Sequence, residues 1–177
     1  MTSPAAILLP HTEMVVADAG PLIHLDELGH VGLLADFPAV RVPEAVWAEV
    51  MHHRPQALQC TEVRWLKCAP TASRQVAALA QIYTLHAGEH EALNLCMALP
   101  DALLLTDDTA ARLAAKTLGI RAHGSLGLLI RAIRRRQLRK SQVLALLQQI
   151  PLQSSLHIRP GLLAEIIRQV NESPDVQ

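Results

Sequence analysis

The chain has very few aromatic residues: two Trp, one Tyr and one Phe among 177 residues. Domains that bind single-stranded nucleic acid by stacking bases, such as RRM and OB-fold domains, depend on aromatic side chains. The sequence therefore disfavours that mode of binding. Half of the residues are hydrophobic and only 18% are charged, which predicts a folded domain rather than a disordered chain.

Three further features are missing. No apolar run approaches the ~20 residues that span a bilayer, and no Lys or Arg precedes Arg41, so the cationic start of a secretory signal peptide is lacking. The cysteines, Cys60, Cys68 and Cys96, are odd in number and have no Cys-x-x-Cys spacing, which disfavours a disulfide framework or a zinc ribbon. We expect a cytoplasmic protein with reduced cysteines and no membrane association.

The net charge of zero conceals an uneven distribution. Residues 1–108 carry 5 basic against 13 acidic side chains, a balance of −8, and residues 109–177 carry 11 basic against 3 acidic ones, a balance of +8. An acidic cluster in the first part would suit a metal site, and the basic second part would suit a polyanion.

Short aliphatic strands alternate with amphipathic helices along the chain. Strands are predicted at 14–17, 39–42, 62–68, 102–106 and 120–122, with the third at a sheet edge. Helices are predicted to begin near residues 21, 31, 43, 73, 88, 108, 124, 141 and 160, and 52–59 is predicted to be a polar break. This alternation predicts a three-layer α/β domain with a central, mostly parallel sheet and additional C-terminal helices. We expect residues 1–140 to form the main domain and 141–177 a helical extension packed on it.

Aspartates follow two of the buried strands. Asp18 comes directly after the first strand, and Asp107 and Asp108 come directly after the fourth. Because ligands of parallel sheets bind beyond the carboxyl ends of the strands, these side chains are candidates for one site. The alternative is helix capping by Asp108 and turn closure by Asp18.

Two glutamates complete the candidate set. Glu49 lies on the helix predicted after Pro43, and Glu89 follows Gly88 at a helix N-terminus. Taken alone, each is more often a solvated surface residue, and Glu89 would also suit the helix dipole. Together with the aspartates they form an oxygen-rich set that suits Mg²⁺ or Mn²⁺, whereas without a cation the carboxylates would repel one another.

The order of these motifs is similar to that of a known family. The segments that carry the likeness are 15–23 (VVADAGPLI), 42–50 (VPEAVWAEV), 88–93 (GEHEAL), 105–112 (LTDDTAAR), 118–120 (LGI) and 124–129 (GSLGLL). Over roughly residues 14–140 the chain resembles a PIN domain, closest to the stand-alone prokaryotic PIN proteins. Family members often have Thr where this chain has Ser125.

The resemblance implies a divalent-metal-dependent nuclease that hydrolyses RNA phosphodiesters, and it suggests the toxin of a toxin–antitoxin pair. It places the four acidic positions on Asp18, Glu49, Glu89 and Asp108, with Asp107 as the second choice for the fourth, around Mg²⁺ or Mn²⁺. Ser125 would position a water or one of these carboxylates. Arg112 would pair with a carboxylate or a phosphate, or form a structural salt bridge.

A basic stretch follows the predicted site. Arg131, Arg134 and Arg135 have helical spacing and share a face, which suits contact with RNA phosphates. A solvated helix face, an acidic antitoxin or a second protomer of a homo-oligomer would use the same charges.

Other functions are weaker alternatives. A PIN-like module that binds nucleic acid or protein without catalysis would keep the same acidic cluster. A receiver-type domain is disfavoured because the paired aspartates come late in the chain, and dinucleotide binding is disfavoured because no Gly-x-Gly-x-x-Gly follows the first strand. The nine histidines lack the His-Glu-x-x-His pattern of a zinc site.

Overall fold

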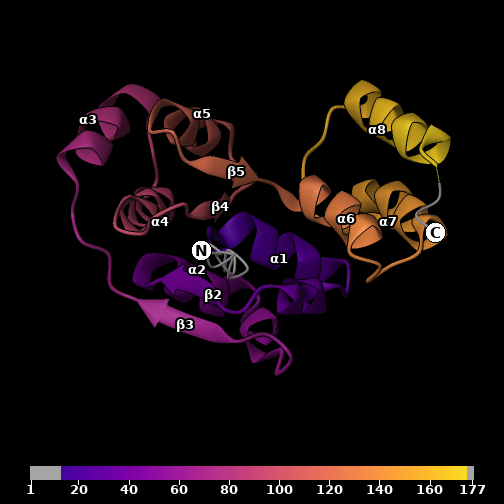
Figure 1. Ribbon diagram of the computed structural model, residues 1–177, viewed down its shortest axis with the longest axis horizontal. Coiled ribbons are helices and arrows are strands. Elements are labelled where there is room, and N and C mark those ends of the chain that lie inside the picture. The colour runs from indigo at the N-terminus through magenta and orange to yellow at the C-terminus, as the bar shows by residue number, and fades with distance from the viewer. Residues whose placement is uncertain (1–12, 175–177) are drawn as a thin grey trace, which may run out of the picture.

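A computed structural model describes residues 13–174. Its centre is a five-stranded sheet in the order β3-β2-β1-β4-β5, in which every pairing is parallel (Figure 1). The strands are β1 (Val15–Ala17), β2 (Val40–Pro43), β3 (Trp65–Cys68), β4 (Leu103–Leu105) and β5 (Arg121–His123). The predicted parallel sheet is confirmed, and β3 lies at its edge as expected.

Helices connect the strands and continue beyond the last one. They are α1 (Ala19–Glu27), α2 (Glu44–His53), α3 (Arg74–Tyr83), α4 (Ala87–Met97), α5 (Thr109–Thr117), α6 (Ser125–Arg134), α7 (Lys140–Gln153) and α8 (Pro160–Glu172), with 3-10 helices η1 (Val31–Asp36) and η2 (Pro55–Gln59). Within residues 13–174, no helix combines the length and the apolar character needed to cross a membrane.

Alternating side chains of the central strands separate two hydrophobic layers. Val15 and Ala17 of β1 face a cluster that includes Leu22 of α1 and Leu129 of α6. Val16 faces the opposite cluster, which includes Leu93 of α4 and residues of α3 and α5. Because β1 is fully buried on both sides, it is apolar throughout, as a central parallel strand must be. The fold is the predicted three-layer α/β arrangement.

Two local predictions need correction. The stretch 52–59 is not simply a polar break, because α2 continues to His53 and η2 follows with Ala57 and Leu58 buried. The sequence offers Thr71 or Ser73 as the cap of α3. Ser73 precedes the helix, but its side chain makes no capping bond, and its backbone N–H donates to Asn94 Oδ1 at 2.8 Å. In both cases a contact outside the local segment outweighs the local preference.

The C-terminal helices share the core of the first layer. Leu147 and Ile150 of α7 and Leu163 of α8 belong to the same buried cluster as β1. The three last helices lie together on the right of Figure 1, with α7 against both α6 and α8.

This packing generates a stability prediction. Leu147 is fully buried, so Leu147→Ala should lower the free energy of unfolding by roughly 2–5 kcal/mol through lost burial and a residual cavity. Leu152 of the same helix is 87% exposed, so Leu152→Ala should change it by less than about 0.5 kcal/mol. Denaturant unfolding should show one transition for both variants. A separate early transition in Leu147→Ala would mean that α7 and α8 unfold independently of the sheet.

Candidate active site

The sheet order brings two aspartate-bearing strand ends together. β1 and β4 are neighbours although the chain between them passes through β2 and β3. The connections leave β1 and β4 toward opposite edges of the sheet, and such a switch point opens a crevice at the carboxyl ends. Asp18 follows β1, and its backbone N–H donates to Leu105 O at 2.8 Å. Asp107 and Asp108 follow β4 two residues further on.

Asp18 is a buried carboxylate whose two oxygens both accept hydrogen bonds. It is the N-cap of α1, where its Oδ1 accepts from Ala19 N at 2.8 Å. Its Oδ2 accepts from Thr106 Oγ1 at 2.9 Å. Burial raises the pKa of Asp18 to about 6, with smaller contributions from the charges of Glu89 and Glu49 and against these two hydrogen bonds. An anion held in these surroundings favours a nearby cation.

Gly88, at the start of α4, brings the backbone close to two of the candidate carboxylates. A Cβ on Gly88 would lie 3.1 Å from Val46 Cγ2, 3.4 Å from Glu49 Oε2 and 3.5 Å from Asp18 Oδ1. The Val46 contact is the tight one, so glycine lets α4 approach α2 closely here, next to Glu49 and Asp18. Glu49 is exposed, whereas Glu89 is buried and its Oε2 accepts from His86 N at 2.8 Å in a capping box.

Glu91 points elsewhere, as the helical spacing predicts. Its Oε2 accepts from Ala45 N at 2.7 Å, in the first turn of α2. The preceding residue Pro43 has no side chain able to cap that helix. Glu91 therefore stabilises the start of the helix that carries Glu49, without joining the cleft.

The paired aspartates after β4 have different partners. Asp107 accepts from Ser125 twice, at 2.7 Å from the backbone N to Oδ1 and at 2.6 Å from Oγ to Oδ2, and His24 Nδ1 lies 2.8 Å from Oδ2. A Cβ on Gly124 would lie only 2.5 Å from Asp107 Oδ1, so the close approach requires glycine. Ser125 thus holds a carboxylate, as one of its two predicted roles requires.

Asp108 is the N-cap of α5. Its Oδ1 accepts from Ala111 N at 2.8 Å, and its backbone N–H donates to Thr106 Oγ1 at 3.2 Å. The capping alternative is therefore realised at Asp108, and Asp18, for which turn closure was the alternative, is also a helix N-cap. Arg112 Nη1 lies beside Gly124, but within residues 13–174 its guanidinium forms no ion pair.

All five predicted acidic residues line one cleft of about 330 Å³. Its walls come from α1, α2, α4, the end of β4 and the connection between α7 and α8, and its lining residues are Asp18, Ala19, Gly20, His24, Glu49, His86, Gly88, Glu89, Asp107, Asp108, Leu156 and His157. Across the described chain, no three acidic, His or Cys side chains stand in a preformed metal-ligand arrangement. Several of these carboxylates are instead bonded to protein donors.

Sequence reasoning missed the histidines of this cleft. His24 stands one helical turn after Gly20 on α1, and both face Asp107. The i, i+4 spacing of Gly20 and His24, directly after the strand-end Asp18, is the sequence pattern that could have predicted this contact. His157 comes from a loop far along the chain, and no local pattern marks it.

A family comparison matches this architecture. The model of a PIN domain family matches residues 14–172. The chain belongs to the PIN domain family. No curated protein is similar enough in sequence to count as a match. The PIN domain match extends through the C-terminal helices, well beyond the 14–140 range on which the sequence motifs were found.

PIN domain nucleases generally use divalent metals, and the donor set of this cleft fits one. Five of the residues that line it are carboxylates, whose oxygens are the ligands that Mg²⁺ and Mn²⁺ prefer. Oxygens of Asp18 and Glu49 both lie close to Gly88, and a bound cation would offset the carboxylate repulsion that contributes to the raised Asp18 pKa.

The three arginines that were predicted to bind nucleic acid make different contacts in the structure. Arg131 and Arg135 both pair with Asp36 of η1, and Arg131 lies over the Phe37 ring with its Cζ 4.4 Å from the centroid. Arg134 is exposed and forms no ion pair within residues 13–174. The three arginines do share one face at the C-terminal end of α6, but the ion pairs with Asp36 neutralise part of the charge of that face.

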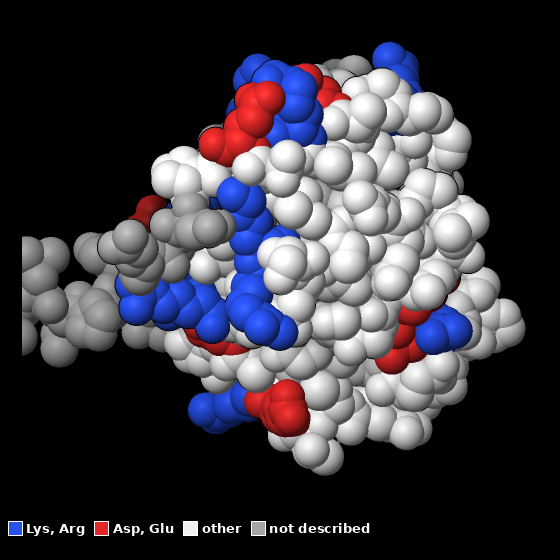
Figure 2. All heavy atoms as spheres, turned by 90° about the vertical axis from the view of Figure 1, so that its right-hand side faces the viewer, with Lys and Arg blue, Asp and Glu red and all other residues white. Residues whose placement is uncertain are grey.

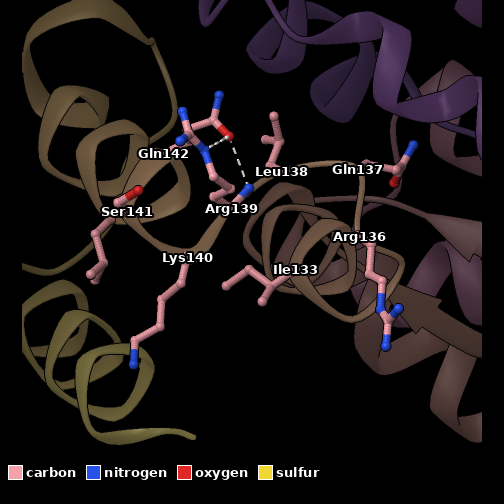
Figure 3. Close-up of a pocket in the computed structure, with 9 residues that line it drawn as sticks. Ile133, Arg136, Gln137, Leu138, Arg139, Lys140, Ser141 and Gln142 are labelled. Carbon is pink, nitrogen blue, oxygen red and sulfur yellow. Dashed lines mark hydrogen bonds between the residues drawn. The ribbon is translucent and has the colours of Figure 1, made fainter. Parts of the chain in front are cut away.

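A second basic group lies at the turn from α6 to α7. Arg136, in the left-handed region at φ 57°, turns the chain, and Arg139 and Lys140 follow. These three line a pocket of about 630 Å³ with Gln137, Ser141 and Gln142 (Figure 3). Lys and Arg form a band on the face that carries α6 to α8 (Figure 2).

The raised pKa of Asp18 predicts a pH-dependent stability. The folded state holds this proton more tightly than the unfolded chain, so the contribution is complete below about pH 4 and is lost as the pH rises through about 6. In chelator, the free energy of unfolding should fall over this range by up to about 3 kcal/mol from Asp18.

Denaturant unfolding at pH 4 and pH 7.5 measures this loss. Asp18→Asn should remove it and be equally or more stable at pH 7.5, because the Thr106 hydroxyl can accept from the amide. Asp101→Asn is the control, since Asp101 is exposed and its φ of 52° suits Asn equally. Equal pH dependence in all three proteins would contradict the burial argument.

Proposed function

We propose that this PIN domain is a divalent-metal-dependent nuclease that cleaves RNA phosphodiesters. The observation that carries the proposal is the buried Asp18 carboxylate, which lines a strand-end cleft with Glu49 and Glu89 and whose pKa is raised in part by their charges. Structural carboxylates of a catalytically inactive module would be expected to pair with cations of the chain. Within residues 13–174 neither Asp18 nor Glu49 forms such a pair.

The protein residues have distinct roles in this proposal. Asp18, Glu49 and Glu89 would hold the metal, with Asp107 and Asp108 on the opposite wall as further ligands, directly or through water. When bound, Mg²⁺ or Mn²⁺ supplies an activated water and neutralises charge on the phosphate. Thr106 and Ser125 fix the orientation of Asp18 and Asp107 through their hydroxyl groups, so the carboxylates need little rearrangement.

Asp107 is the stronger candidate for the acid position that the resemblance left open. Both of its oxygens are oriented by Ser125, and His24 contacts one of them. Asp108 already satisfies the α5 N-terminus through Oδ1. This reverses the preference taken from the family resemblance, where Asp108 came first.

RNA is the proposed substrate because the protein offers a basic band for phosphate contacts in addition to an acidic cleft. Phosphate contacts supply affinity without sequence information. An acidic antitoxin or a second protomer would compete for the same band.

Cleavage by matched variants tests the catalytic assignment. The purified protein should cleave single-stranded RNA with Mg²⁺ or Mn²⁺ and lose this activity in chelator. Asp18→Asn should lower kcat/KM at least 100-fold, because the amide lacks the charge that holds a hard cation. Glu49→Gln should lower it as well, whereas Glu44→Gln, an exposed acid on the same helix outside the cleft, should leave it unchanged.

Metal-independent cleavage, or full activity of Asp18→Asn, would contradict this assignment. Circular dichroism of each variant controls for unfolding. An unmodified protein that binds RNA and Mn²⁺ without cleaving would favour the binding-module alternative.

Salt dependence of RNA binding tests the basic band. In the Asp18→Asn background, Arg134→Gln with Arg139→Gln should weaken binding of unrelated RNA sequences about equally and flatten the log–log salt slope by roughly 0.7 per lost contact. Arg74→Gln, exposed at the start of α3, is the control. An unchanged slope with a changed solution mass would assign the band to a second protomer. An unchanged slope and an unchanged mass would show that the band does not bind RNA, and would leave an acidic partner protein or a plain solvated face as the two alternatives.

A further inference from the structure

The connection between α7 and α8 forms one wall of the acidic cleft. Leu156 and His157 line the same cavity as Asp18, Glu49 and Glu89. These two residues lie beyond the motifs that mark the PIN domain in the sequence. The cleft is therefore completed by the C-terminal helices.

A carboxylate at the far end of α1 fixes the start of this connection. Glu27 Oε2 accepts from Ser154 Oγ at 2.8 Å and from Ser155 N at 2.7 Å, and Glu27 Oε1 accepts from Ser155 Oγ at 2.9 Å. Burial opposes the charge of Glu27, but these hydrogen bonds outweigh it and lower its pKa. The ionised form thus holds the connection.

The next residue is anchored by the core. Leu156 N donates to Ser154 Oγ at 3.1 Å, and its side chain packs against the cluster that contains β1. Asp18 is the N-cap of α1 and Glu27 is its last residue, so one helix positions both the buried acid and the connection between α7 and α8. His157 therefore lines the cleft from a segment that is held by the Glu27 hydrogen bonds and by the packing of Leu156.

His157 differs from the other histidines of the cleft. His24 is held by Asp107, and His86 Nδ1 lies 3.4 Å from Glu89 Oε1. His157 is exposed, and its ring has no hydrogen bond or ion pair within residues 13–174. In either neutral tautomer its ring offers one N–H donor. Opposite a wall of carboxylates, such a donor suits a phosphate oxygen.

We propose that His157 contacts the RNA substrate, donating a hydrogen bond to a phosphate oxygen in the cleft, and that Glu27 is its positioning residue. The inference rests on the proposed nuclease function and assigns part of substrate recognition to the C-terminal helices. Because the contact is made to the bound substrate and kept in the transition state, its loss should raise KM and leave kcat nearly unchanged.

Steady-state cleavage of a short single-stranded RNA with Mn²⁺ tests the contact. His157→Ala should raise KM about tenfold, as expected for a lost hydrogen bond to a charged group. His157→Gln, which keeps a donor, should recover part of this loss. His52→Ala removes another exposed imidazole outside the cleft and should leave KM unchanged.

A double-variant cycle tests the positioning role. Glu27→Gln should raise KM less than His157→Ala does, and it should add nothing to KM in the His157→Ala background. A purely structural effect of Glu27 would lower the melting temperature and shift KM equally in both backgrounds, which would overturn its assignment.

The two proposals fail in different ways. If the unmodified protein cleaves RNA and His157→Ala does so with the same KM, the contact is overturned while the nuclease function stands. If the unmodified protein cleaves no RNA with either metal, both are overturned. A tenfold loss of kcat at constant KM would also overturn the contact, because it would place His157 in the chemical step.

Discussion

The parallel pairing of β1 with β4 is the constraint on which the cleft depends. It joins residues nearly ninety positions apart and carries the hydrogen bond from Asp18 N to Leu105 O. Both strands are buried on both faces, so their packing holds this register, and a slip of one residue would break that bond and shift Asp18 relative to the aspartates after β4. The hydrophobic core thereby fixes the positions of polar side chains that contribute nothing to it.

Helix N-termini recur around this cleft. Asp18 and Asp108 cap α1 and α5, and Glu89 closes the capping box of α4. The positive ends of three helices thus stabilise carboxylates that would otherwise repel. Capping and cation binding are compatible, since an ionised carboxylate has about four acceptor positions and each of these caps uses one or two.

The C-terminal helices have a closer relation to the cleft than a peripheral extension would. Their apolar side chains enter the layer beneath β1, and their connection is tied to α1 through Glu27. α1 has Asp18 at its N-terminus and Glu27, which holds the connection between α7 and α8, at its C-terminus. This helix therefore links the proposed substrate contact to the packing of the sheet.

Local patterns in the sequence were enough to predict the strands, most of the helices, the parallel sheet and the aspartates at the carboxyl ends of two strands, whereas the choice of Glu49 and Glu89 rested on the family resemblance. Period-two and helical spacing determine these features, because they depend on neighbours within a few residues. The tertiary structure alone decided that Asp107, rather than Asp108, forms hydrogen bonds with Ser125 and His24. It also decided that Arg131 and Arg135 pair with Asp36, and that His157 enters the cleft. Each of these contacts joins residues from separate elements, and the packing of helices on the sheet sets their geometry, which no local pattern encodes.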